Sequence, residues 1–220
     1  MACQSRSPQP TGHRFPSTIA ALGGALALAG ALAGRPTLLD WGSTAPERRA
    51  RLPGDDWISR ADLQATRGIT VHAAEVAVWP WVAQLGQGRG GFYSYDFLEN
   101  LVGCDIHSAT RVIPDLQAVR IGDTIRLAPE VGLTVVEVAP PSVLVLRGGV
   151  PIGGARPPFD FTWAFVLREE PGARTRLLVR ERYRYLSWWV GPMVELVELV
   201  SFLMTQKMLR EIRTRAESDA

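Results

Sequence analysis

The fold is decided by the stretch FDFTWAFVLREEPGARTRLLVRERYRY, residues 159–185. Apolar and aromatic residues recur there at every second position, which predicts β-strands over residues 159–169 and 174–185. Glu170-Pro171-Gly172 between them is typical of a short turn. We therefore expect the two strands to pair antiparallel as a hairpin.

The alternation gives this hairpin two distinct faces. One face carries Phe161, Trp163, Phe165 and Leu167 from the first strand, and Leu177, Val179, Glu181 and Tyr183 from the second. A carboxylate on a mostly apolar face is costly unless it meets a partner or a ligand. Glu181 is therefore the sharpest single candidate for a ligand contact. The alternative is an ion pair with Arg126 or another arginine.

Three more short strands are predicted upstream of the hairpin, at about 122–128, 132–139 and 142–148. The turns that separate them contain Pro129-Glu130-Val131-Gly132 and Pro140-Pro141, and connections this short indicate an antiparallel meander. Further upstream, residues 65–73 alternate polar and apolar side chains and predict one more strand.

Three helices complete the pattern. Residues 74–85 have helical spacing, and a short helix is predicted over 95–102 with Ser94 as its N-cap and Gly103 as its end. A long helix is predicted over 187–216. This order of elements indicates an α+β fold, in which a curved antiparallel sheet wraps around the last helix and leaves an internal cavity.

The composition excludes several kinds of chemistry. A net charge of +2 does not indicate nucleic acid as a partner. Lys207 is the only lysine, so the body of the chain has neither a Gly-Lys phosphate loop nor a Schiff-base lysine. The two cysteines and three histidines lie too far apart for a metal-binding motif. We predict neither a metal nor a cofactor.

The N-terminal part precedes the regular pattern. Residues 1–18 form a polar leader, 19–34 an uncharged hydrophobic helix, 35–61 a linker or wrapping arm, and 62–217 the folded domain. As a helix, the hydrophobic segment spans about 24 Å, against roughly 30 Å for a bilayer core. We favour a single membrane anchor whose orientation stays open. The alternative is a secreted protein, cleaved after a signal peptide at Ala31-Leu32-Ala33.

Three runs carry a resemblance to a known family: QGRGGFYSYD (87–96), FDFTW (159–163) and LVRERY (178–183). With the order of elements, they resemble the START-like, or SRPBCC, superfamily of helix-grip folds. This superfamily includes polyketide cyclase/dehydrase-like proteins and pollen-allergen-type binders. More closely, the chain is similar to a bacterial subgroup that carries an N-terminal hydrophobic segment. The resemblance covers about residues 62–217 and implies an elongated, mainly apolar cavity closed by the C-terminal helix.

The block Gly86–Gly91 matches the spacing of a dinucleotide-binding loop. That loop requires a preceding strand and a βαβ unit, whereas here a helix precedes and the sheet is antiparallel. We therefore interpret the block as a mobile hinge at the rim of the cavity. Asp105 and His107, just beyond it, could form a general acid–base pair. The alternative is that both have only structural roles.

The residues predicted to line the cavity are aromatic, with a few polar groups to orient a ligand. They are Trp81, Tyr93, Tyr95, His107, Arg126, Trp163, Glu181 and Tyr183.

The main hypothesis is a membrane-tethered protein that binds or carries a hydrophobic small molecule or lipid, without catalysis. The first alternative is a cyclase- or dehydratase-type enzyme in which His107, Asp105 or Glu181 is the acid or base. The second is an interaction module whose cavity is filled by its own side chains. The sequence does not indicate an oligomeric state.

Overall fold

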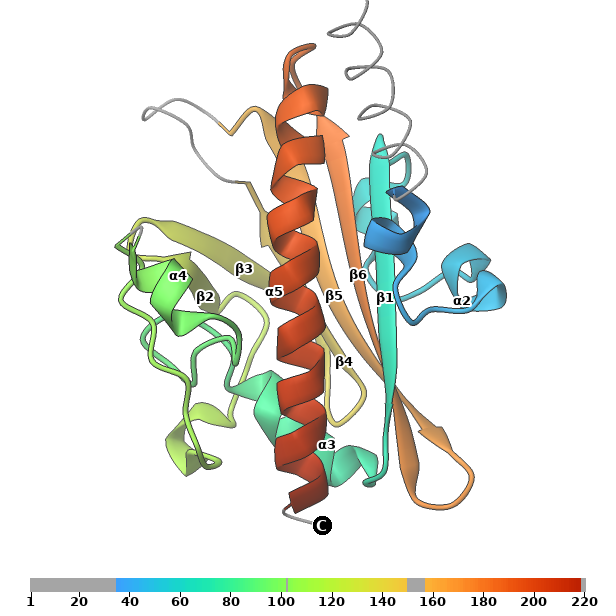
Figure 1. Cartoon of the computed structure of the whole chain (residues 1–220), viewed down its shortest axis with the longest axis vertical. Helices are drawn as coiled ribbons and strands as arrows, with labels where there is room; N and C mark the ends of the chain where they lie inside the picture. The colour runs from blue at the N-terminus through green and yellow to red at the C-terminus, as the bar shows by residue number, and fades with distance from the viewer. Residues whose placement is uncertain (1–34, 102, 150–156, 219–220) are drawn as a thin grey trace, which may run out of the picture. The chain divides into compact units, whose positions relative to one another are not determined.

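The structure is a computed structural model that describes residues 35–101, 103–149 and 157–218 (Figure 1). The predicted polar leader and the hydrophobic segment 19–34 lie outside these residues. The chain divides into two compact units, residues 1–36 and 37–220, and the elements below belong to the second. Within the described ranges, no helix combines the length and apolarity needed to cross a membrane.

One antiparallel sheet of six strands forms the body of this unit, in the order β1-β6-β5-β4-β3-β2. The strands are β1 (Leu63–Val71), β2 (Thr124–Ala128), β3 (Val131–Ala139), β4 (Val143–Gly148), β5 (Phe159–Glu170) and β6 (Arg174–Tyr185). The predicted meander of the last five strands is confirmed. β1 pairs with β6, far away in the sequence, so the first strand lies beside the last one.

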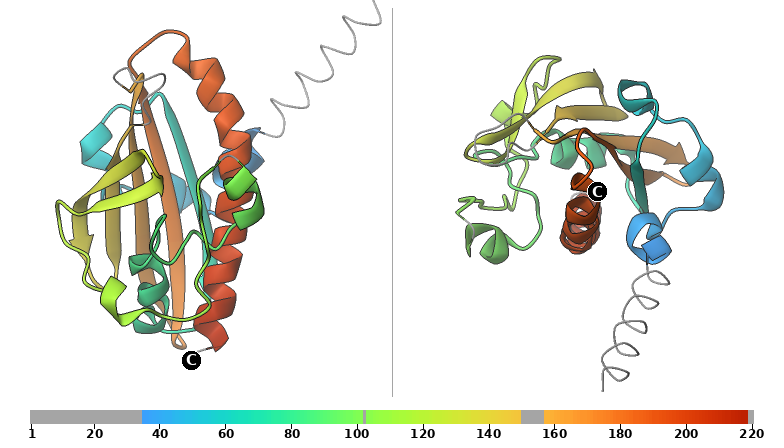
Figure 2. Two further views of the ribbon diagram at one scale, coloured as in Figure 1. Left: turned by 90° about the vertical axis from the view of Figure 1, so that its left-hand side faces the viewer. Right: turned by 90° about the horizontal axis from the view of Figure 1, so that it is seen from above.

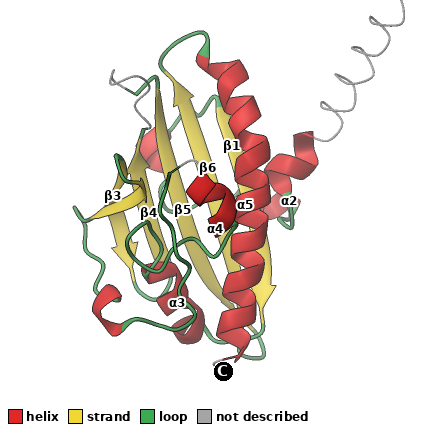
Figure 3. Ribbon diagram, turned by 60° about the vertical axis from the view of Figure 1, so that its left-hand side comes forward, coloured by secondary structure: helices red, strands yellow, loops and turns green. Residues whose placement is uncertain are grey.

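The helices lie mostly on one side of this sheet. They are α2 (Ala45–Arg49), α3 (Glu75–Ala83), α4 (Asp96–Leu101) and α5 (Val190–Ser218), with short 3-10 turns η1 (Asp55–Ile58) and η2 (Pro114–Leu116). Seen from above, the curved sheet arches over α5, and α4 lies in the same layer (Figure 2). Figure 3 shows α5 running along β1 and β6. The predicted α+β helix-grip arrangement is confirmed.

The two predicted faces of the hairpin are confirmed by its register. Phe161 pairs with Tyr183, Trp163 with Glu181, Phe165 with Val179, and Leu167 with Leu177. Most of these side chains are buried on the concave side, which faces α5. Leu133, Leu144 and Leu146 extend the same buried layer across β3 and β4. Alternation therefore places one side of every strand in a common core.

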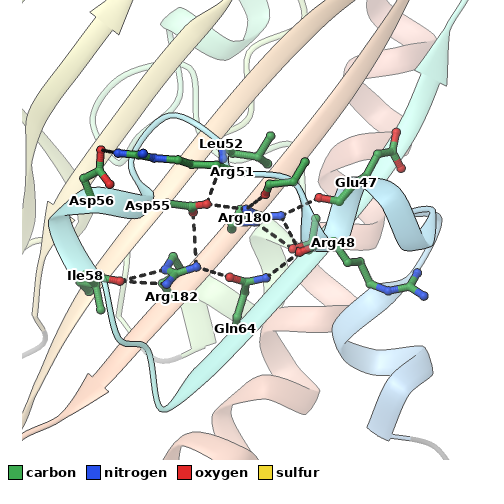
Figure 4. Close-up of polar contacts among 12 residues, drawn as sticks. Glu47, Arg48, Arg51, Leu52, Asp55, Asp56, Ile58, Gln64, Arg180 and Arg182 are labelled. Carbon is green, nitrogen blue, oxygen red and sulfur yellow. Dashed lines mark hydrogen bonds and ion pairs between the residues drawn. The ribbon is translucent and has the colours of Figure 1, made fainter.

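The outer face of β6 binds the N-terminal arm, residues 45–58, through arginines (Figure 4). Arg180 is 1% exposed and donates to the backbone oxygens of Glu47 and Ala50, at 2.7 and 2.8 Å, and to Asp55 at 2.7 Å. Its Nε donates to Thr66 on β1. Because these bonds satisfy the guanidinium in a dry position, the arm is tied to the sheet rather than free.

The start of α4 differs from the prediction. The helix begins at Asp96, one residue later than expected, and the buried hydroxyl of Ser94 has no hydrogen-bond partner among the described residues. The predicted N-cap at Ser94 is therefore wrong. Asp96 instead accepts hydrogen bonds from the backbone nitrogen and hydroxyl of Ser108, at 2.7 and 2.6 Å. This carboxylate ties the helix to the following loop, a contact that local sequence does not reveal.

Candidate functional site

Glu181 lies at the centre of a buried polar cluster between β1, β6 and α5. Its side chain is 3% exposed and forms an ion pair with Arg67 of β1 at 2.8 Å. Three hydroxyl groups also donate to it: Ser201 at 2.9 Å, Tyr183 at 3.2 Å and Thr205 at 3.3 Å. Glu181 thus has the charge-assisted and neutral donors that a buried carboxylate requires.

Glu198 is the second carboxylate of the cluster and is less well satisfied. Its Oε2 accepts from Arg67 at 2.7 Å, whereas its buried Oε1 has no hydrogen-bond partner among the described residues. Burial and the neighbouring charge of Glu181 raise the pKa of Glu198 to about 8, although Arg67 and the Tyr183 hydroxyl oppose this shift. At neutral pH the protonated form of Glu198 is therefore favoured.

Arg67 joins the two carboxylates to the chain that enters the domain. Its guanidinium also donates from Nε to the backbone oxygen of Leu38 at 2.9 Å. The Arg67 side chain is 1% exposed, and the attraction of Glu181 and Glu198 raises its pKa against the effect of burial. The arginine is therefore a fixed charge around which the polar cluster is organised.

Aromatic side chains surround this polar centre. Trp163 of β5 pairs directly with Glu181 of β6, so both lie on the concave face. The ring of Trp163 lies 4.8 Å from that of Phe165 and 6.0 Å from that of Phe92. Tyr183 packs on Phe161 at 4.7 Å, and its burial raises the pKa of the phenol well above the ordinary value. The surroundings of Glu181 are thus dry and mainly apolar.

A second aromatic group lies toward the C-terminal half of α5. Trp81 of α3 meets Tyr93 edge-on at 5.7 Å, and the guanidinium of Arg215 lies 4.9 Å from the Tyr93 ring. The Tyr93 hydroxyl accepts from Gln84 at 2.8 Å, and burial raises its pKa to about 12. Since Phe92 contacts Trp163, the segment 92–94 links this aromatic group to the polar cluster.

Four buried polar atoms on this side of the sheet have no protein hydrogen-bond partner in the described ranges. They are the indole nitrogens of Trp81 and Trp163, the hydroxyl of Ser94 and Oε1 of Glu198. An unpartnered buried polar group costs about 1–3 kcal/mol. Native interiors contain few such atoms, and those present generally meet water or a ligand. The concave face therefore offers several polar contacts that the protein itself does not use.

The remaining predicted site residues lie outside the cluster. Tyr95 is 41% exposed and receives Lys207 over its ring, and Arg126 is exposed on β2. His107 and Asp105 form a pair at 3.2 Å, with side chains 82% and 80% exposed. The structure thus brings together Glu181, Tyr183 and Trp163, whereas His107 and Asp105 lie at the solvent. Neither His107 nor Arg126 is among the partners of Glu181.

The glycine block forms a turn whose two ends are bonded to each other. Gly86 and Gly91 exchange backbone hydrogen bonds at 3.0 and 3.1 Å. Arg89 spans the turn and donates to the backbone oxygens of Ala83 and Leu116, both at 2.9 Å. These bonds satisfy the backbone within the loop and hold its two ends together, and the role of the block as a mobile hinge stays a prediction.

Arg67, Glu198, Ser201 and Thr205 were missed in the sequence. Arg67 shares the inward alternation of Leu63, Ala65 and Ile69, and Glu198 shares the helical stripe of Val190 and Val194. A charged residue on a buried stripe is the same signal that identified Glu181. In the described residues, no group of three or more His, Cys, Asp or Glu side chains could hold a metal ion.

Two hollows lie at the N-terminal arm. Their volumes are about 490 and 270 Å³, and they are lined mainly by residues 48–59, with Glu137 in the larger one and Arg180 and Arg182 in the smaller. None of the eight predicted ligand-binding residues lines them. The internal cavity on the concave side thus stays a prediction.

The fold and the buried cluster define an α+β helix-grip protein with a polar centre beneath its long helix. No protein-family model matches the chain, and no curated protein matches it either. Among solved structures, it is similar to the hypothetical protein jhp0584 of Helicobacter pylori, with 12% identity and a TM-score of 0.48 over 76% of this chain and 96% of that one.

The chain is also similar to two further solved structures, with lower TM-scores. DynU16, from the dynemicin biosynthetic locus, is 16% identical with a TM-score of 0.41, over 70% of this chain and 48% of its own. CalU16 of Micromonospora echinospora is 17% identical with a TM-score of 0.34, over 70% and 84%. Likenesses this distant carry no information on ligand or activity.

Proposed function

We propose that the chain is a START-like protein that binds or carries a hydrophobic small molecule or lipid on its concave face, tethered to a membrane by residues 19–34 and without catalysis. The helix-grip arrangement supports this assignment, because it sets an aromatic, apolar sheet face against a long covering helix. Such surfaces, with a few placed polar groups, are typical of small-molecule sites.

The observation that carries the proposal is the set of four unpartnered polar atoms. Trp81 and Trp163 can only donate hydrogen bonds through their indole nitrogens. A protonated Glu198 adds a third donor, and Ser94 a fourth. A ligand that satisfies them is apolar in bulk and carries uncharged oxygen acceptors, such as carbonyl, ester or ether groups. An amine would find no free ionised partner here, because Glu181 is already bonded to Arg67.

The test is native mass spectrometry of the purified full-length chain in detergent, followed by organic extraction and identification of bound molecules. The expected result is a co-purified apolar compound that contains oxygen acceptors. Trp163→Phe keeps the aromatic contact but removes the indole nitrogen, and we expect it to weaken binding of that compound. Trp57→Phe, on the outer face beside Arg147, is the matched control. A chain that retains no ligand and binds none from a lipid extract would refute the proposal.

A second candidate is a cyclase- or dehydratase-type enzyme that acts on such a ligand. A buried carboxyl group that keeps its proton near neutral pH is suited to general acid catalysis, and Glu198 is such a group. Under this alternative, Glu198→Gln abolishes turnover of the bound compound while its binding persists. His107→Ala removes the exposed pair with Asp105. It therefore tests the alternative in which His107 and Asp105, rather than Glu198, are the acid and base. If wild type and both variants all leave the bound compound chemically unchanged, the enzyme alternative is refuted and ligand binding remains as the proposed function.

A further inference from the structure

Large exposed apolar side chains gather on one part of the molecule. Eight of them lie on and just before the N-terminal half of α5: Leu186, Trp188, Trp189, Leu196, Val197, Leu199, Val200 and Leu203. Trp188 is 94% exposed and Leu196 is 71% exposed. We call these eight residues the α5 apolar face. Scattered single apolar residues are normal on a protein surface, but a continuous helix face of this kind marks an interaction site.

This face is the reverse of the stripe that holds the buried cluster. Val190, Val194, Glu198 and Thr205 point toward the sheet, whereas Leu196, Val200 and Leu203 point away from it at helical spacing. The helix is therefore apolar on both sides over this length. The sheet covers one side, and the other side is exposed. On α4, Phe97 and Leu101 are two more exposed apolar side chains, at 77% and 73%.

The position of the N-terminal chain indicates what covers this face. Arg67 bonds the backbone oxygen of Leu38 at 2.9 Å and Glu198 at 2.7 Å, so Leu38 lies beside the buried side of α5, at the height of Glu198 along the helix. Gly34, the last residue of the hydrophobic segment, precedes Leu38 by four residues, which span at most about 14 Å. A bilayer that holds this segment would therefore come within reach of α5.

The flanking residues fit the same partner. Trp188 and Trp189 occupy one end of the face, and tryptophan is enriched where protein meets the membrane interface. Exposed Arg184 precedes the face, and basic side chains favour the headgroup region of anionic lipids. An amphipathic helix with these features lies in the plane of the interface with its apolar side in the lipid.

We propose that the α5 apolar face docks onto the surface of a lipid bilayer, so that the helix covering the ligand site is itself in contact with lipid. The proposal rests on the membrane tether of the proposed function. It adds that a second, specific surface of the folded unit contacts the same membrane. The proposed ligand site beneath α5 then lies next to the lipid bilayer, in which an apolar ligand would be dissolved.

The test uses the full-length chain in phosphatidylcholine–phosphatidylglycerol vesicles with brominated acyl chains, which quench tryptophan fluorescence only on contact. The expected result is quenching in wild type that is mostly lost in Trp188→Phe/Trp189→Phe, because the other described tryptophans lie off this face. Leu196→Gln/Val200→Gln is expected to reduce it severalfold. Val76→Gln/Ile121→Gln is the matched control: these residues are 70% and 68% exposed outside the face, and quenching should stay at the wild-type level.

Each other outcome overturns the docking. If the chain floats with the vesicles but Trp188 and Trp189 are quenched only by aqueous acrylamide, the tether stands and the docking is refuted. If neither quencher acts and cross-linking captures a dimer through α5, a second copy covers the face instead. If the chain does not float with vesicles at all, both tether and docking fail, whereas ligand binding is measured separately and is unaffected.

Discussion

The buried carboxyl of Glu198 gives a prediction about how stability depends on pH. Its pKa is about 8 in the folded state, against 4.5 for an unperturbed glutamate. Below pH 4.5 the group is protonated whether the chain is folded or not, so it contributes no pH dependence. Between pH 4.5 and 8 the unfolded chain loses this proton while the folded chain keeps it. Raising the pH therefore favours unfolding in this window.

The size of this pH effect follows from the single proton that Glu198 binds in the folded but not in the unfolded chain. The free energy of unfolding falls by about 1.4 kcal/mol per pH unit, or about 3 kcal/mol between pH 5.5 and 7.5. Glu198→Gln removes this titration, and its amide oxygen can still accept from Arg67. The difference in stability between the variant and wild type should therefore rise by about 3 kcal/mol across this range, and should level off above about pH 8.

The assay is urea unfolding of the full-length chain, followed by circular dichroism at several pH values from 5 to 9. Subtracting wild type from Glu198→Gln cancels the titration of all other groups that the substitution leaves unchanged. Glu195→Gln, exposed on the same helix, is the control and should follow the wild-type pH profile. A difference between Glu198→Gln and wild type that stays constant from pH 5.5 to 7.5 would refute the reasoning, because Glu198 would then be ionised in the fold.

Three further predictions concern the contacts around the site. Arg67→Met should cost about 3–5 kcal/mol in unfolding free energy, because it removes the ion-pair partner of the buried Glu181 side chain, whereas Arg120→Met at the surface should change stability little. Arg180→Met should free the arm over residues 45–58, seen as faster proteolytic cleavage there while the core stays intact; equal cleavage rates would contradict its role as a tie. Gly91→Ala should lose more thermal stability than Gly88→Ala. Both glycines have positive φ, but a Cβ at Gly91 would lie 2.8 Å from the Cα of Ser108, whereas at Gly88 it meets nothing within 4 Å.

Much of the sheet could be predicted because its pattern is local. Alternation along residues 159–185 is a property of each strand alone, and the turn at Pro171-Gly172 sets the register of the hairpin. The inward direction of Glu181 followed from this register without any knowledge of distant residues. The start of α4 was predicted less accurately than the strands. The partner of Asp96 is Ser108, which lies in a loop brought back by tertiary contacts.

The sequence by itself determined which face of each strand is buried and that a carboxylate lies on the buried side. Only the tertiary structure decided what this carboxylate meets. Arg67 is 114 residues from Glu181 and becomes its neighbour because β1 pairs with β6 at the edge of the sheet. Glu198 joins them because α5 packs across both strands. Side-chain alternation is fixed by backbone geometry over a few residues, whereas charge partners depend on which distant elements pack together.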